Sequence, residues 1–225
     1  MDENGRVAES DSDREFFRTY GPWEPYTPAE AAAAMQGFAA PWWVVGGWAI
    51  EAFTGVSRDH EDIDLGIFTS DFPELRRQLG DRFHLWSNHG GTFRVVTDER
   101  PEPLDPLAQT WVREHAGAPW VMDVILNAVG DGVWRARRDL DLEAPLDEVT
   151  WTRDGIRYLN PELVLFFKAR LQRPKDELDL ASCLPLLGAD QRSWLHDALR
   201  QAYGDHAWLA RLAEPGSDSG RVTPG

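Results

Sequence analysis

Two short stretches decide the fold of this 225-residue chain: VVGGWA at residues 44–49 and RDHEDIDL at residues 58–65. In the first, an apolar run that starts at Trp42 predicts a short buried strand, which Gly46-Gly47 ends before a helix expected over residues 48–53. Glycines at such a junction let the backbone approach a bulky anion, and a helix N-terminus offers unpaired N–H groups to it. This stretch therefore predicts a phosphate-binding turn.

The second stretch leads into an alternating segment, residues 62–68, which predicts a strand. Asp62 and Asp64 point to one face of it, while the apolar residues between and after them point to the other face and are expected to be buried. Two neighbouring carboxylates repel each other unless a cation neutralises them, and Mg²⁺ prefers carboxylate and phosphate oxygens. We therefore expect Asp62 and Asp64 to hold Mg²⁺, in a site suited to in-line attack on phosphorus.

A third carboxylate, Asp123, lies inside the otherwise apolar run of residues 120–126, where an unpartnered charge is costly to bury. Beside Asp62 and Asp64 it would share the metal or accept a proton from an attacking hydroxyl. An ion pair with one of the many arginines is the alternative. A lone Asp-x-Asp or Gly-Gly pair is common in proteins without such a site, but the order of strand, glycines, helix, Asp-x-Asp strand and isolated Asp is far more restrictive.

Turn and capping signals divide the rest of the chain. Residues 1–20 are polar and expected to be flexible, strands and helices alternate over residues 21–155, helices follow over 156–213, and the Gly-, Ser- and Pro-rich residues 214–225 are expected to be disordered. Within the core, Thr27-Pro28-Ala29-Glu30 predicts a capped helix start, residues 107–114 favour a helix, and residues 133–136 are expected to pair back onto a strand at 120–129. The fold class is therefore an α/β core with a helical C-terminal part.

Composition narrows the class of protein. The net charge of −15 disfavours a nucleic acid partner, because proteins that grip phosphate backbones usually carry a basic stripe. No apolar run reaches the roughly 18 residues that a membrane span needs, and the acidic N-terminus does not read as a secretory signal. The single cysteine, Cys183, excludes a disulfide within one chain and is expected to be a buried helix residue. We expect a cytoplasmic protein with no membrane partner.

The basic residues are divided unevenly, with 21 arginines and only two lysines, Lys168 and Lys175. An ammonium group is a compact point charge toward phosphate, whereas a guanidinium is a planar fork. The two lysines are therefore candidates for phosphate contacts, with chance as the alternative. Pro174 is expected to break the helix between them.

At these residues the sequence resembles the nucleotidyltransferase superfamily that includes DNA polymerase beta. It is more specifically similar to the aminoglycoside 2″-adenylyltransferase and lincosamide nucleotidyltransferase types. The resemblance is tight over residues 43–68, through Gly46-Gly47-Trp48-Ala49-Ile50, Gly55, Arg58, His60 and Asp62-Ile63-Asp64-Leu65. It continues more loosely through Asp123, Asn160-Pro161-Glu162, Lys168, Lys175-Asp176 and Asp179.

The resemblance implies a mixed sheet flanked by helices and a Mg²⁺-dependent transfer of a nucleoside monophosphate, AMP from ATP, to a hydroxyl of a small molecule. More specifically, the predicted acceptor is an aminoglycoside-like antibiotic. Asp62, Asp64 and Asp123 would form the metal and catalytic site, and Gly46 and Gly47 would face the triphosphate. Lys168 and Lys175 would neutralise phosphate charge, and Arg58 and His60 would orient the loop or the nucleotide, or act only structurally. Glu51 stands where related sequences often have Asp, and we expect it to pair with Arg58.

Two other functions remain open at this level. Related folds nucleotidylate a partner macromolecule in toxin–antitoxin pairs, and the acidic charge favours a protein over RNA as that acceptor. A non-catalytic nucleotide-binding module is the other reading, and the retention of three carboxylates argues against it. The oligomeric state, the donor base and the acceptor are not determined by the sequence.

Overall fold

The computed structural model describes residues 15, 18–128, 132–136 and 141–213. Most of the segment 1–20, for which we predict flexibility, and all of 214–225, for which we predict disorder, lie outside the described residues.

A mixed sheet of eight strands organises the described part of the chain. Its strands, in spatial order, are β4 (Thr92–Val95), β3 (His84–His89), β5 (Gln109–Arg113), β6 (Met122–Asn127), β2 (Asp64–Phe68), β1 (Trp42–Val44), β10 (Ile156–Leu159) and β9 (Thr150–Arg153). The pairs β2–β6 and β1–β10 are parallel and the other pairs are antiparallel. The short strands β7 (Val133–Arg135) and β8 (Glu143–Pro145) pair with each other.

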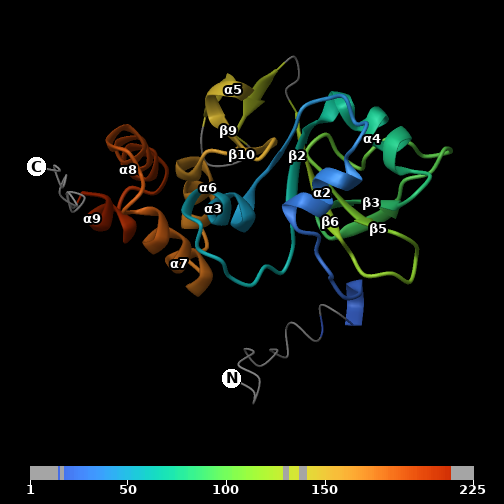
Figure 1. Cartoon of the computed structure of the whole chain (residues 1–225), viewed down its shortest axis with the longest axis horizontal. Helices are drawn as coiled ribbons and strands as arrows, with labels where there is room; N and C mark the ends of the chain where they lie inside the picture. The colour runs from blue at the N-terminus through green and yellow to red at the C-terminus, as the bar shows by residue number, and fades with distance from the viewer. Residues whose placement is uncertain (1–14, 16–17, 129–131, 137–140, 214–225) are drawn as a thin grey trace, which may run out of the picture.

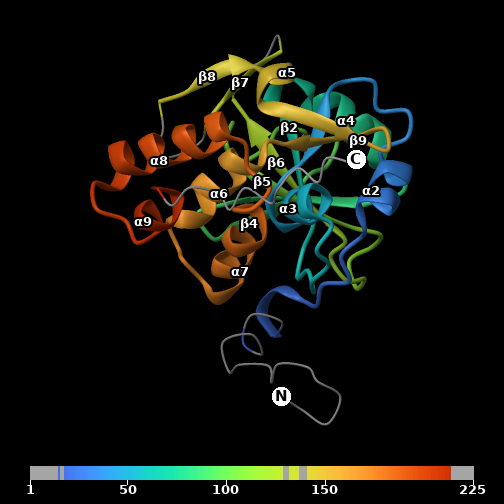
Figure 2. The ribbon, with the colours of Figure 1, turned by 60° about the vertical axis from the view of Figure 1, so that its left-hand side comes forward.

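Helices lie on two opposite sides of this sheet (Figures 1 and 2). The first group, near the N-terminus, comprises α2 (Pro28–Ala34), the short η1 (Thr69–Asp71) and α4 (Phe72–Leu79). The second group comprises α6 (Pro161–Ala169), α7 (Pro174–Cys183), α8 (Ala189–Tyr203) and α9 (Trp208–Ala213). Between strands, α3 (Gly46–Thr54) contacts α6 and α7, and α5 (Leu146–Val149) precedes β9. The mixed sheet flanked by helices, with helices at the C-terminal end, is the predicted fold class.

The two faces of β2 have different roles. Leu65 and Ile67 are fully buried in the same hydrophobic core as Ala31 of α2 and Leu75 of α4. The opposite face carries Asp64 and then Gly66, as the alternation predicts. The apolar face therefore anchors the strand while the other face is available for chemistry.

Gly66 is a glycine because of its neighbour across the sheet. Trp43 of β1 pairs directly with Gly66, and a Cβ on Gly66 would lie 2.2 Å from the indole ring. The indole lies across the strand at this point, 2% exposed, and both residues line the cavity described below. The absence of a side chain at Gly66 thus leaves room for the Trp43 indole to lie over β2.

Other local predictions are confirmed. The Thr27 hydroxyl accepts a hydrogen bond from the Glu30 N–H, and the Glu30 carboxylate accepts one from the Thr27 N–H, which completes the capping box at the start of α2. Cys183 is fully buried at the end of α7, and burial raises the pKa of its thiol to about 12. Pro174 starts α7, so the helix is broken between Lys168 and Lys175.

Three predictions are wrong. Residues 107–114 do not form a helix, because residues 109–113 are strand β5, held between β3 and β6. Residues 133–135 pair with β8 rather than with β6, and the Asn127 side chain bonds both the N–H and the carbonyl of Arg135 instead. The region from residue 156 does not start as a helix, because β9 and β10 form a hairpin whose inner strand joins β1.

No helix among the described residues combines the length and the apolar character needed to cross a bilayer.

Candidate active site

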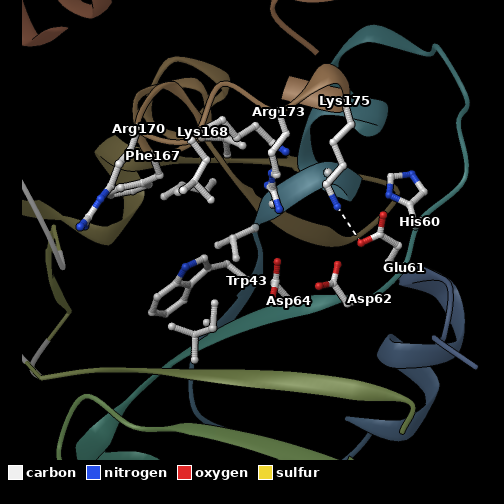
Figure 3. Close-up of a pocket in the computed structure, with 18 of the residues that line it drawn as sticks. Trp43, His60, Glu61, Asp62, Asp64, Phe167, Lys168, Arg170, Arg173 and Lys175 are labelled. Carbon is white, nitrogen blue, oxygen red and sulfur yellow. Dashed lines mark hydrogen bonds and ion pairs between the residues drawn. The ribbon is translucent and has the colours of Figure 1, made fainter. Parts of the chain in front are cut away.

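A pocket of about 560 Å³ separates the sheet from helices α6 and α7 (Figure 3). Its sheet-side wall comes from β1, β2, the start of α3 and the loop before β2, with Trp43, Gly46, Gly47, Asp62, Asp64 and Gly66. Its helix-side wall carries Phe167, Lys168, Arg170, Leu171, Arg173 and Lys175. The two glycines, the two carboxylates and the two lysines singled out in the sequence therefore line one cavity.

The two carboxylates lie side by side on the sheet wall (Figure 3). Asp64 is the first residue of β2, and Asp62 is exposed in the loop just before it. Burial, and next the charge of Asp62, raise the pKa of Asp64 to about 7, while the cations Lys168, Lys175 and Arg173 act in the opposite direction. A carboxylate in this position is poorly stabilised as an anion until a further positive charge arrives.

The glycine turn lies directly against these carboxylates. Gly46 has φ +66°, and a Cβ there would lie 2.5 Å from Asp64 Oδ2. At Gly47 a Cβ would lie 2.1 Å from Arg58 Nη2 and 2.9 Å from His60 Nδ1. A side chain at Gly46 would therefore have to displace Asp64, and one at Gly47 would have to displace Arg58 and His60.

Asp123 lies on the strand next to Asp64. The two are register partners in the parallel β2–β6 pair, and Asp123 is 4% exposed. Its Oδ2 accepts a 2.5 Å hydrogen bond from Gln109 Nε2 on β5. Asp123 is not among the residues that line the pocket, and within the described ranges no group of three His, Cys, Asp or Glu side chains is placed to hold a metal ion.

The helix wall is strongly basic, and each of its lysines is engaged by a carboxylate. Lys168 Nζ lies 2.8 Å from Asp179 and 3.2 Å from Asp176, and it is 8% exposed. Lys175 Nζ lies 2.8 Å from Glu61, which precedes Asp62, so this ion pair joins the two walls (Figure 3).

Arg173 reinforces the same wall. Its guanidinium and its backbone N–H donate to Asp176, as the cap of α7. Burial alone would raise the pKa of Asp176, but the Arg173 hydrogen bonds and the charge of Lys168 outweigh it and the pKa is lowered. Asp176 is therefore an anion that holds two of the wall's cations in place.

His60 and Arg58 lie behind the glycine turn. The His60 ring stacks on Trp48 at 3.9 Å between centroids, and Nε2 lies 2.8 Å from Glu51. Burial lowers the pKa of His60 and so favours the neutral ring, although the Glu51 contact opposes this. The predicted Glu51–Arg58 ion pair is wrong: Glu51 accepts from the Arg58 backbone N–H, and the Arg58 guanidinium binds Asp179.

Sequence reasoning missed three of the charged lining residues, Glu61, Arg170 and Arg173. The signal for Arg173 was available, since it stands immediately before Pro174 at a predicted helix start with Asp176 three residues later. Nothing local marks Glu61 or Arg170, because their place in the site depends on how α6 and α7 pack against the sheet.

The residues present fit a magnesium ion. Mg²⁺ in nucleotide sites is commonly held by one or two carboxylates, with phosphate oxygens and water completing its shell. Asp62 and Asp64 supply two such carboxylates, and burial together with the charge of Asp62 disfavours the ionised form of Asp64, whose pKa is raised to about 7. A divalent cation between them would supply that charge.

A protein-family model, aminoglycoside-2″-adenylyltransferase, matches residues 29–99. The matched segment contains the glycine turn, Asp62 and Asp64, and it ends before Asp123 and the basic wall. A search of the curated proteins finds no match. The family match confirms the resemblance to nucleotidyltransferases and supports an enzyme of that class.

The solved structures that match this chain are distant in sequence. The antibiotic-resistance factor ANT(2″)-Ia is 18% identical with a TM-score of 0.45, over 78% of this chain and 90% of its own. A putative nucleotidyltransferase from H. pylori is 14% identical with a TM-score of 0.44, over 83% of this chain and 86% of its own. The Megavirus polyadenylate synthase is 15% identical with a TM-score of 0.42, over 98% of this chain and 42% of its own.

Proposed function

From the nucleotidyltransferase resemblance of residues 29–99, we propose that this enzyme transfers AMP from ATP to a hydroxyl group of a small molecule. The observation that carries the proposal is the pairing of opposite charges across one pocket. Asp62 and Asp64 lie on one wall, and the cations Lys168, Arg173 and Lys175 on the other act electrostatically on Asp64. A magnesium-bound triphosphate has the charge pattern that fits between them, with cation toward the carboxylates and phosphates toward the basic wall.

The charged end of the pocket would hold the triphosphate. Asp62 and Asp64 would hold Mg²⁺, which when bound supplies neutralising charge at the reacting phosphate and the leaving group. Gly46 and Gly47 line the same pocket at the start of α3, where unpaired backbone N–H groups would donate to phosphate oxygens. Arg173 and Lys175 would contact the phosphates from the helix side, Lys175 exchanging its Glu61 partner for phosphate.

The end of the pocket opposite Lys175 includes an aromatic side chain, Phe167. Phe167 and Arg170 lie at the end opposite Lys175 (Figure 3), and the lining includes Trp134 and Tyr203. A planar base can be bound there by contact with aromatic rings, while the triphosphate reaches the carboxylates. This arrangement supports a nucleotide that lies along the pocket with its base toward Phe167 and its phosphates toward Lys175.

The transfer step needs a proton acceptor. The acceptor hydroxyl oxygen attacks the α-phosphorus, the bond from that phosphorus to the bridging oxygen breaks, and pyrophosphate leaves. Asp123 is the proposed acceptor of the hydroxyl proton, because it is the register partner of Asp64 and carries a carboxylate beside the metal-binding pair. In that role it would exchange its Gln109 hydrogen bond for the substrate hydroxyl.

The proposed acceptor is a cationic, hydroxyl-bearing small molecule of the aminoglycoside type. The family match and the net charge of −15 support it, since an acidic protein attracts cations. The test incubates the protein with Mg²⁺, ATP and a panel of aminoglycosides and lincosamides, and follows AMP-modified products by mass spectrometry. If no panel member is modified, the antibiotic form of the proposal fails, and labelling of a lysate protein from radiolabelled ATP would favour a protein acceptor.

A further inference from the structure

We propose that Asp179 is a positioning residue for the nucleotide site, which it serves by fixing Arg58 and Lys168 at once. The inference rests on the proposed function, because the property it governs is the binding of MgATP. Asp179 lies on α7, outside the pocket lining, and is 3% exposed. Its effect on the site is therefore transmitted through the two cations that it holds.

The contacts of Asp179 are short and directional. Arg58 Nε donates to Oδ1 at 2.9 Å and Arg58 Nη2 donates to Oδ2 at 3.0 Å, which is a bidentate pair between residues 121 positions apart. Lys168 Nζ lies 2.8 Å from the same Oδ2. Charge-assisted bidentate pairs of this kind fix geometry as well as contributing energy.

On the sheet side, the Arg58–Asp179 pair fixes the position of the loop before Asp62. Arg58 Nη1 donates to the carbonyl of Asp59 at 2.8 Å, and Nη2 lies so near Gly47 that a Cβ there would be 2.1 Å away. Asp179 thus ties α7 to the glycine turn and to the loop that delivers Asp62 and Asp64. Its removal would free that loop relative to the basic wall.

On the helix side, Asp179 shares Lys168 with Asp176. Asp176 touches Lys168 and Arg173, and no contact links it to Arg58 in the described structure. Of these two carboxylates, therefore, only Asp179 connects the helix wall to the glycine turn. This difference separates positioning from simple charge balance.

The competing explanation makes the opposite prediction. If Asp179 only neutralised Lys168, its replacement by Asn would leave one carboxylate fewer beside the Lys168 ammonium group. Lys168 would then attract phosphate more strongly, and MgATP would bind more tightly. If Asp179 positions the site, the same replacement misplaces the loop and the cations, and MgATP binds more weakly. The sign of one measured change decides between them.

The experiment measures the MgATP dissociation constant by calorimetry for wild type, Asp179→Asn, Arg58→Gln and the double variant, each confirmed as folded by circular dichroism. We expect each single variant to bind at least about tenfold more weakly, since replacing residues that orient metal-site groups typically costs about 10- to 100-fold in affinity. The double variant should be no weaker than the weaker single variant, because both changes remove the same contact. Asp179→Glu, which restores a carboxylate, should bind more tightly than Asp179→Asn.

Binding by Asp179→Asn that equals or exceeds that of wild type overturns the inference, as do fully additive losses in the double variant. If Asp179→Asn does not fold, Arg58→Lys serves instead, because it keeps the charge and loses the planar fork. Wild-type affinity in Arg58→Lys then overturns the inference. Failure of the proposed function is distinguishable, because in that case wild type itself binds no MgATP.

Discussion

Gly46 faces the carboxylate of Asp64 so closely that a Cβ on Gly46 would be 2.5 Å from Oδ2. The contact joins the first residue of α3 to the first residue of β2. The glycine that ends the first strand and the carboxylate that starts the second are therefore parts of a single site. The separation of the two residues is fixed by steric contact, so any side chain at position 46 must displace the carboxylate.

Gly46→Ala should abolish MgATP binding while the protein remains folded. The new methyl group would push Asp64 out of position, and the backbone at φ +66° would add about 1–2 kcal/mol of strain. Calorimetric titration measures the binding, and thermal melting measures the stability.

Gly55→Ala is the matched control for this change. Gly55 has φ +71°, close to that of Gly46, but a Cβ there meets nothing within 4 Å. It should lose a similar amount of stability and keep its affinity for MgATP. If the two variants bind MgATP equally well, the contact between Gly46 and Asp64 has no role in binding.

Glu61→Gln should bind MgATP about two- to fivefold more tightly than wild type, the range that an exposed ion pair of about 0.5–1 kcal/mol allows. The Glu61 carboxylate holds Lys175 at 2.8 Å, is 76% exposed, and adds negative charge where the triphosphate is proposed to bind. Its loss would free the ammonium group for phosphate.

The control for this charge change is Glu148→Gln, an exposed residue outside the pocket lining, which should leave the affinity unchanged. Weaker binding by Glu61→Gln would show that Glu61 contributes to holding the cation rather than competing with the nucleotide.

Glu162→Gln should become more stable relative to wild type as the pH rises. Burial raises the pKa of Glu162 above its ordinary 4.5, although hydrogen bonds from its own backbone N–H, from Gln191 and from Asn160 oppose the shift. The folded state thus binds the proton more tightly than the unfolded state, so the contribution of Glu162 is fully present below about pH 4.5 and is lost as the pH rises through the folded-state pKa.

Melting temperatures of wild type and Glu162→Gln between about pH 4 and pH 8 measure this difference. The Gln side chain can keep the contact with Gln191, which in wild type is 2.7 Å long. A difference in melting temperature that does not change with pH would show that Glu162 ionises normally in the folded protein.

The local part of the fold could be predicted from the sequence because its signals are local. Alternation assigned Asp64 and Leu65 to opposite faces of β2, and the glycine pair marked the start of α3. The Thr27 capping box likewise depends on residues three positions apart. The shortage of Lys in this Arg-rich chain singled out Lys168 and Lys175, and both line the pocket.

The missed parts depend on contacts between distant segments. Residues 109–113 form a strand because β3 and β6 lie on either side of it, which no local pattern records. The β9–β10 hairpin had a usable signal, since Asp154-Gly155 turns with both φ angles positive, at 52° and 77°. The Arg58–Asp179 pair spans 121 positions and could be found only from the packing of α7 against α3.

The most direct test of the account is calorimetric titration of ATP, with and without Mg²⁺, into wild type and into the Asp62→Asn, Asp64→Asn double variant. We predict that wild type binds ATP only with Mg²⁺. The double variant should lose about 100-fold or more in affinity, since mutating even the residues that hydrogen-bond metal ligands lowers metal affinity about 10- to 100-fold. Equal binding by both proteins, or wild-type binding that does not depend on Mg²⁺, would contradict the claim that Asp62 and Asp64 hold the metal against a triphosphate.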